Sequence, residues 1–125
     1  CSNLKNDYAE VKQWNYPAGR FVKTGLQFCG LVMGDHSKTA INTMLNTGTV
    51  VGVATNIFGD GFPRNFIPSF SWGGAAGFTE CSAEKACEIA ERVTARRNVE
   101  FTEVDKKILT EVFKMTAKYR ISQKK

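Results

Sequence analysis

Residues 33–60, MGDHSKTAINTMLNTGTVVGVATNIFGD, repeat a pattern every six positions. The first position of each six is apolar in four of five cases, and its residues are Met33, Thr39, Leu45, Val51 and Ile57. The fifth position always carries a small hydroxyl residue, namely Ser37, Thr43, Thr49 or Thr55. An amphipathic helix needs apolar residues every three or four positions, and a half-buried strand needs one every second position. A period of six fits neither.

A period of six is typical of a solenoid in which short parallel strands form the flat sides of successive coils. The apolar residue would fill the interior, and the hydroxyl residue would fit beside it near a corner. Small residues at the second position, such as Gly34 and Gly52, tolerate the tight turns that such corners need. The sequence therefore predicts a hexapeptide-repeat solenoid, and the alternative is an ordinary β-sandwich with coincidental spacing.

The bulk composition narrows the class of protein. The chain has 125 residues and a net charge of +5, which fits one domain and is compatible with an anionic ligand or with nothing specific. Its four cysteines (Cys1, Cys29, Cys81 and Cys87) form no Cys-x-x-Cys pair and accompany one histidine, so we expect no metal site. Because neither a secretion signal nor a membrane-length apolar run is present, we expect reduced thiols in a cytoplasmic protein.

The start of the chain and the number of repeats predict that this is a piece of a longer protein. The first residue is Cys1 rather than methionine, and five hexads make fewer than two coils. Stacked-repeat proteins need about three or more units to bury a continuous core. Either earlier coils precede this stretch, or association with other chains supplies the missing burial.

Four segments follow from the pattern. They are residues 1–32, a loop or hairpin entering the solenoid; 33–60, the hexapeptide coils; 61–81, an aromatic loop that docks on a neighbouring surface; and 82–121, two C-terminal helices. Ser82 is a predicted N-cap of the first helix, and Thr102 with Asp105 predicts a capping box at the second. The apolar stripe of the second helix is too large to leave in water; it comprises Val104, Ile108, Val112, Met115 and Tyr119.

Four segments carry a family resemblance: NLKNDY (3–8), MGDHSK (33–38), NTGTVVG (46–52) and IPSFSWGG (67–74). All four resemble segments of sugar nucleotidyltransferase-like proteins of Bacteroidetes. The stretches CSNLKNDY (1–8), GLVMGDHSKTAIN (30–42) and TGTVVG (47–52) resemble the related C-terminal acetyltransferase domain of the bifunctional N-acetylglucosamine-1-phosphate uridylyltransferase/glucosamine-1-phosphate acetyltransferase family. The resemblance implies a mainly β fold, a left-handed parallel β-helix, which would be followed here by the two α-helices.

The resemblance also implies a function. The chain would be the C-terminal part of an acetyl-CoA-dependent amino-sugar-phosphate acetyltransferase domain in a UDP-N-acetylglucosamine-type biosynthetic protein, assembled as a homotrimer. Acetyl-coenzyme A would bind between subunits, and a sugar amine would attack its thioester, which requires a base and oxyanion donors. Asn3 falls on the family's sugar-contacting asparagine, Leu4 replaces the adjacent tyrosine, and Lys5 is a phosphate partner. The family's catalytic histidine lies about one coil before this chain begins.

His36 is the one histidine and lies next to Asp35, which makes it a candidate catalytic base. The alternative is a surface or inter-subunit histidine at a corner of the solenoid, with the true base upstream of this chain. Cys29 is a candidate nucleophile, and its alternative is a small buried residue. Whether this chain is itself an enzyme is therefore left open by the sequence.

A different class of function is a non-catalytic trimerisation module that assembles a sugar nucleotidyltransferase. Nucleic-acid binding through the basic C-terminal helices is disfavoured, because acidic residues such as Glu84, Glu88 and Glu111 interleave with the basic ones. We therefore expect no nucleic-acid partner and no membrane partner.

Overall fold

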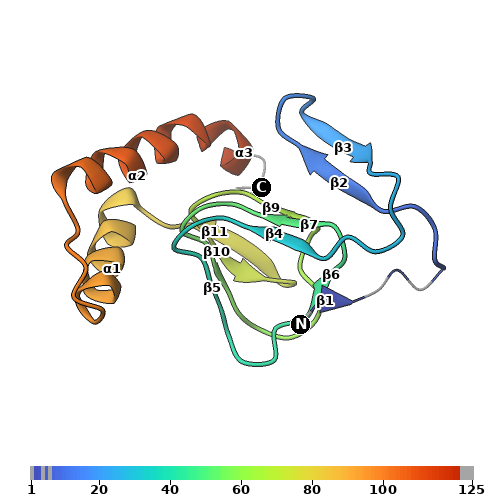
Figure 1. The fold of residues 1–125 in the computed structure, drawn as a ribbon, viewed down its shortest axis with the longest axis horizontal. Helices are drawn as coiled ribbons and strands as arrows, with labels where there is room; N and C mark the ends of the chain where they lie inside the picture. Colours follow the sequence, from blue (N-terminus) through green and yellow to red (C-terminus); the bar gives the residue numbers. More distant parts are fainter. Residues whose placement is uncertain (1, 4, 6, 122–125) are drawn as a thin grey trace.

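The computed structural model describes residues 2–3, 5 and 7–121. Figure 1 shows short strands stacked in the centre, a hairpin on one side of them and helices on the other. The strands are β1 (Ser2–Asn3), β2 (Lys12–Asn15), β3 (Arg20–Lys23), β4 (Leu31–Met33), β5 (Lys38–Thr39), β6 (Leu45–Asn46), β7 (Thr49–Val51), β8 (Asn56–Ile57), β9 (Phe66–Ile67), β10 (Ser71–Gly74) and β11 (Gly77–Glu80). The helices are α1 (Ala83–Ala95), α2 (Glu103–Met115) and α3 (Ala117–Ile121).

The strands of the described residues form four small sheets. Two are parallel, with orders β1-β6 and β4-β7-β9, and one is the antiparallel hairpin β2-β3. The fourth, β11-β10-β8-β5, is mixed, because β10 and β11 run antiparallel and the other pairs run parallel. Leu31 pairs with Thr49, whereas Val50 pairs with Phe66, so the sequence separation of parallel partners is not constant.

The predicted left-handed parallel β-helix followed by two α-helices is wrong for this chain. The described part of the chain holds four separate sheets of two to four strands in mixed orientation, together with three helices, and no solenoid. Parallel pairing ends where the chain turns back on itself between β10 and β11, and the hairpin β2-β3 departs from it before β4. The six-residue period covers too short a stretch to impose one architecture on these flanking segments.

The periodic residues nevertheless form the interior. Leu45, Val51, Ile57 and Ile67 make one buried cluster, and each is at most 3% exposed. The hydroxyl residues Thr43, Thr49 and Thr55 are buried as expected. The hydroxyl groups of Thr55 and Ser37 share a 2.8 Å hydrogen bond. The first positions of the first two hexads are not buried: Met33 is 39% exposed, and Thr39 is also exposed. The apolar period therefore marks the core only from Leu45 onward.

Glycine allows successive turns of the chain to approach closely. A Cβ placed on Gly52 would overlap the backbone nitrogen of Ser69, and one on Gly34 would lie 2.8 Å from the carbonyl carbon of Gly52. No side chain fits at such a close approach. The residue at the second position of these hexads is therefore small for two reasons. Neighbouring backbones meet there, and the chain turns tightly there.

The segment predicted as an aromatic loop, residues 61–81, contains strands β9, β10 and β11. Its glycines do not break the strands but let them pack. A Cβ on Gly73 would overlap the carbonyl oxygen of Gly77, and one on Gly74 would overlap that of Phe58. Glycine within a strand often marks such a close approach of another backbone. Phe70 is fully buried and belongs to a second buried cluster, which includes Ala90 of α1 and Leu109 of α2.

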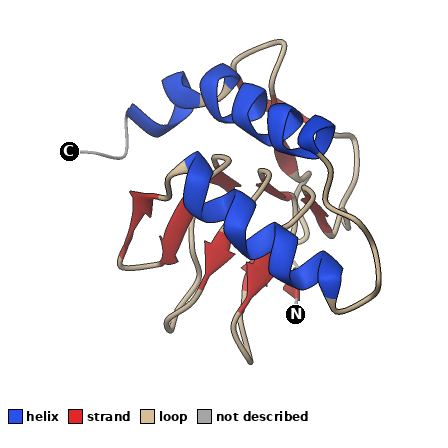
Figure 2. Cartoon of the chain, turned by 90° about the vertical axis from the view of Figure 1, so that its left-hand side faces the viewer, coloured by secondary structure: helices blue, strands red, loops and turns tan. Residues whose placement is uncertain are grey.

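The helices begin at the predicted caps. The side chain of Ser82 accepts a hydrogen bond from the Lys85 backbone, and Thr102 and Asp105 form a complete capping box. Figure 2 shows α1 and α2 on the same side of the strands, and the two helices pack against each other. A third helix, α3, follows a break at Thr116, whose backbone N–H and hydroxyl both donate to the Val112 carbonyl.

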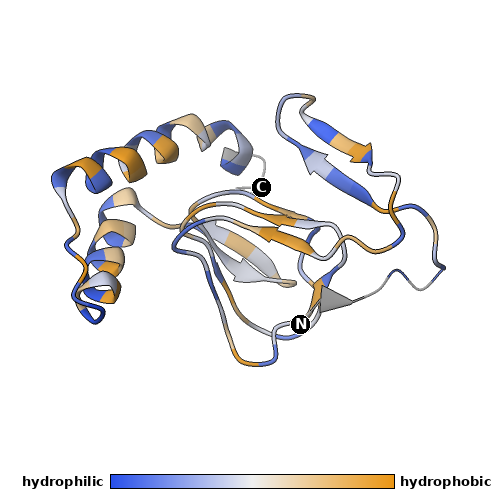
Figure 3. Cartoon of the chain, in the orientation of Figure 1, coloured by the Kyte–Doolittle hydropathy of each residue, from blue (hydrophilic) through white to orange (hydrophobic). Residues whose placement is uncertain are grey.

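The predicted stripe of α2 is only partly covered. Val112 packs against the buried cluster that contains Phe70 and Leu109. In contrast, Val104, Ile108 and Met115 are between 55% and 70% exposed. Figure 3 shows these apolar bands along α2 and further ones in β4 and β7. Within the described residues, no helix combines the length and apolar character needed to cross a membrane.

Candidate functional site

Lys5, one of the two predicted substrate residues, lines a cavity of about 610 Å³, the Lys5 cavity. Seven of the described residues line it: Lys5, Val11, Lys12, Phe21, Asn46, Thr47 and Asn65. Strand β1 places the backbone of Asn3 beside this cavity, because Asn3 is the parallel partner of Asn46. The Asn3 side chain and Leu4 lie outside the part that the structure describes. The structure therefore brings Lys5 and the strand that carries Asn3 to one place.

The electrostatics of this cavity favour an anion. Lys5 and Lys12 line it, and the seven lining residues include no carboxylate. Lys23 is the direct cross-strand partner of Lys12 in the β2-β3 hairpin, and both side chains are exposed. Like charges directly opposite each other destabilise a strand pair, so a bound anion would relieve this repulsion. The ammonium group of Lys5 donates one hydrogen bond, to the Glu10 carbonyl at 3.2 Å. An ammonium group has further N–H donors with which to bind a ligand.

Amides and an aromatic ring complete the lining. The Asn46 amide donates to the Asn65 side-chain oxygen at 3.3 Å, which fixes the two side chains relative to each other. The Thr47 hydroxyl accepts from the backbone N–H groups of Cys29 and Gly30, each at 3.0 Å. The Phe21 ring adds an apolar surface. Cations, amides and one apolar face are the groups that recognise a phosphorylated sugar.

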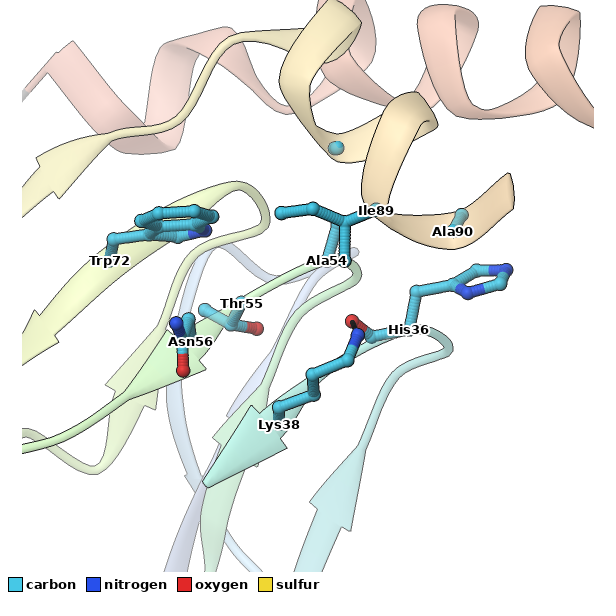
Figure 4. Close-up of a pocket in the computed structure, with 9 residues that line it drawn as sticks. His36, Lys38, Ala54, Thr55, Asn56, Trp72, Ile89 and Ala90 are labelled. Atoms are coloured by element: carbon cyan, nitrogen blue, oxygen red, sulfur yellow. Dashed lines mark hydrogen bonds between the residues drawn. The ribbon is translucent and has the colours of Figure 1, made fainter. Parts of the chain in front are cut away.

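His36 lies in the turn between β4 and β5, at a second and much smaller cavity. Figure 4 shows its imidazole turned away from Asn56 and Trp72, while the Lys38 ammonium reaches back to donate to the His36 carbonyl at 3.3 Å. The ring meets Phe101 edge to face, with centroids 6.5 Å apart. The cavity holds about 30 Å³. Such a volume suits a single water molecule and is too small for a sugar.

His36 has a left-handed backbone conformation, and the same conformation occurs in the turns at Ala54 and Phe70. The φ values of His36, Ala54 and Phe70 are 61°, 55° and 60°. The Ala54 N–H donates to the Asp35 carbonyl, and the Phe70 N–H donates to the Val53 carbonyl. Histidine is one of the residues that enter this left-handed region more readily than most. The backbone conformation at His36 is therefore accounted for by the turn itself.

The structure does not bring His36 and Lys5 together within one chain. Strands β4, β7 and β9 are parallel, and the Lys5 cavity lies where β7 and β9 begin, at Thr47 and Asn65. His36 follows the opposite end of β4. His36 is therefore not placed to act as a base in the Lys5 cavity of the same chain.

The environments of Cys81 and Cys87 disfavour an activated thiol. Cys81 and Cys87 are buried, and desolvation raises the pKa of both thiols, although Lys85 near Cys81 and Lys106 near Cys87 act in the opposite direction. Cys29 is partly buried next to β4, and Cys1 lies outside the described residues. Among the residues described, no group of three or more histidine, cysteine, aspartate or glutamate side chains could hold a metal ion.

Several cavity residues were missed from the sequence. Lys12 and Phe21 reach the cavity because hairpin pairing turns them to one face, and Asn65 arrives from a distant segment. The one signal in the sequence was the spacing of Lys12 and Trp14, which are two residues apart and therefore share one face of a short strand. Comparison with protein-family models, with curated proteins and with solved structures finds no match to this chain.

Proposed function

We propose that this chain is the C-terminal, sugar-binding part of an acetyl-CoA-dependent amino-sugar-phosphate acetyltransferase domain in a sugar-nucleotide biosynthetic protein. The observation that carries the proposal is the cationic, amide-lined cavity to which Lys5 and strand β1 contribute. Two lysines would bind the phosphate, the amides of Asn46 and Asn65 would bind sugar hydroxyls, and Phe21 would cover an apolar face of the ring.

In this proposal the cavity binds and orients the sugar, and it does not supply the base. Attack on a thioester needs a neutral amine, so a proton must pass to a group of suitable pKa. None of the seven lining residues is a histidine, aspartate, glutamate or cysteine. The base would come from elsewhere in a homotrimer or from upstream sequence, with acetyl-coenzyme A bound between subunits. His36 stays a candidate for that base.

The second candidate function is a non-catalytic trimerisation module of a sugar nucleotidyltransferase. It is favoured by the apolar side chains left uncovered on α2 and at β4, which association would bury. It is also favoured by the separation of His36 from the Lys5 cavity. This candidate predicts a trimer that neither binds the sugar phosphate nor releases thiol from acetyl-coenzyme A.

Titration calorimetry with glucosamine-1-phosphate tests the binding part of the proposal. Wild type should bind, and Lys5→Ala and Lys12→Ala should each weaken binding about tenfold or more, because each removes a charge-assisted contact. Lys107→Ala is the matched control, since this exposed lysine of α2 lies away from the cavity. A trimer by light scattering that shows no binding would favour the scaffold instead.

Thiol release from acetyl-coenzyme A, with glucosamine-1-phosphate as acceptor, tests catalysis by the same protein. Turnover that disappears in His36→Ala, with sugar binding retained, would make His36 the base. Binding without turnover would mean that this chain supplies only the sugar site, and assay of the full-length parent would then show whether the base lies upstream.

A further inference from the structure

Four aromatic rings from three elements pack together beside the Lys5 cavity. Trp14 of β2 lies flat on Phe66 of β9, with centroids 4.2 Å apart and planes 5° apart. Tyr119 of α3 meets Trp14 and Phe66 edge to face at 6.2 and 5.7 Å. Tyr16, just after β2, meets Tyr119 at 5.4 Å. The aromatic cluster Trp14–Tyr16–Phe66–Tyr119 thus joins the hairpin to the strands and to the C-terminal helix.

The Trp14 indole makes ring contacts but no side-chain hydrogen bond among the described residues. Its Nε1 is buried and has no hydrogen-bond partner among the described residues. A buried indole N–H usually finds a partner, because leaving it unpaired is costly. Since no hydrogen bond fixes the indole N–H, the position of the ring depends on its packing, and among its ring contacts those with Phe66 and Tyr119 come from outside the hairpin.

Helix α3 is fixed to the body of the protein at the residue after Tyr119. Arg120 is 1% exposed, and its Nε donates to the Glu80 carboxylate at 2.8 Å. Its other nitrogens donate to the carbonyls of Ser69 and Phe113 at 3.0 and 2.7 Å. These bonds reach β11, the segment before β10, and α2. Tyr119 therefore projects from a rigid base.

The hairpin face that carries Trp14 also carries part of the cavity wall. Residues two apart in a strand share a face, so Lys12 lies beside Trp14, and Phe21 is the direct cross-strand partner of Trp14. The Phe21 ring meets the Trp14 ring at 5.4 Å. Lys12 and Phe21 both line the Lys5 cavity. A change at Trp14 is therefore transmitted to two lining residues within the same hairpin.

We infer that Tyr119 is a positioning residue, which holds the β2-β3 hairpin so that Lys12 and Phe21 form the wall of the Lys5 cavity. The C-terminal helix would thereby set the affinity of a site that none of its described side chains lines. The ligand part of this inference rests on the proposed function, whereas the placement of the hairpin is independent of it.

The test compares Tyr119→Ala, which removes the ring, with Tyr119→Phe, which keeps it. Tyr8→Ala is the matched control, because this exposed tyrosine meets only Phe28 among the ring contacts of the described residues. The chain has two tryptophans, so a Trp72→Phe background leaves Trp14 as the sole tryptophan reporter. The readouts are Trp14 emission, amide hydrogen exchange in residues 12–23, the melting temperature, and calorimetry with glucosamine-1-phosphate.

We expect Tyr119→Ala to shift Trp14 emission to the red and to speed hairpin exchange, in a protein that still melts cooperatively. Its affinity for glucosamine-1-phosphate should fall about tenfold, as for the loss of one contact to a charged group. Tyr119→Phe keeps the ring and should stay closer to wild type than Tyr119→Ala in all four readouts, and Tyr8→Ala should leave them near the wild-type values.

Unchanged Trp14 emission and hairpin exchange in Tyr119→Ala would overturn the positioning role. Unchanged affinity in Tyr119→Ala, with binding lost in Lys5→Ala, would also overturn it and leave the proposed function standing. Absence of sugar-phosphate binding by wild type would instead refute the proposed function, and the emission and exchange readouts would still decide whether Tyr119 holds the hairpin.

Discussion

Arg120 and Glu80 form an ion pair of 2.8 Å in which the arginine is 1% exposed and the glutamate side chain 30% exposed. The pair connects α3 to β11 across a long stretch of sequence. The guanidinium also lies 4.2 Å from the Phe113 ring centroid, so it is enclosed by aromatic as well as polar groups. The C-terminal helix is therefore tied to the strands by a charge that has little access to water.

Glu80→Gln should destabilise the protein by about 3 kcal/mol, because it leaves a buried guanidinium without its counter-charge. Urea unfolding at pH 7 measures the change. Glu88→Gln on α1 is the control, since this glutamate is exposed. A surface substitution usually changes stability by at most about 0.5 kcal/mol. Equal stability of the two variants would contradict the importance of the buried pair.

Val51→Asp should prevent folding or cost about 4 kcal/mol or more, because a carboxylate at a buried position cannot be solvated. Val51 is 2% exposed, whereas Val32 in β4 is 54% exposed. Val32→Asp is therefore a close comparison in which the charge would remain in water, and we expect it to cost about 0.5 kcal/mol. Circular dichroism and urea unfolding of both variants would show whether damage follows burial; similar damage from both would place Val32 in a buried interface.

The stability of the protein should fall as the pH rises above about 8.5, the ordinary pKa of a thiol. Desolvation raises the pKa of Cys81 and Cys87 in the folded state, so the unfolded chain releases these protons first. Their contribution is fully present below the unfolded pKa and is lost at higher pH. Burial also raises the pKa of Tyr16, with Tyr119 as a second cause, which extends the loss above about pH 10.

Urea unfolding from neutral to alkaline pH tests this dependence, and the double variant Cys81→Ala/Cys87→Ala should show a shallower fall above about pH 8.5. The same burial predicts slow alkylation of both thiols by iodoacetamide in the folded protein. An unchanged pH profile in the double variant would show that other groups cause the loss.

Thr102→Ala should destabilise the protein by about 1 kcal/mol, because the hydroxyl caps α2 by accepting from the Asp105 backbone. Thr102→Ser keeps the hydroxyl and should remain near wild type. Urea unfolding of the pair measures the difference. A cost in Thr102→Ser as large as that in Thr102→Ala would mean that the methyl group, rather than the cap, stabilises this turn.

Local features of this protein were predictable and the architecture was not. The caps at Ser82 and Thr102 were found because a cap is a contact between residues three apart, which a linear sequence displays directly. The interior positions of Thr49, Thr55 and Ile57 were found because a repeated pattern reports which side chains share an environment. The repeat covers only residues 33–60 and does not specify how the flanking segments fold, so the predicted β-helix was wrong.

The sequence by itself determined where α1 and α2 begin and that Leu45, Val51 and Ile57 share the interior. The role of Lys5 as a phosphate partner came from the family resemblance and stays a prediction. Only the tertiary structure decided that Lys12, Phe21 and Asn65 join Lys5, that His36 lies at the opposite end of the strands, and that Arg120 pairs with Glu80. The reason is physical. Each of these relationships depends on strand pairing and packing between residues far apart in the chain, and such contacts leave no periodic signal in the sequence.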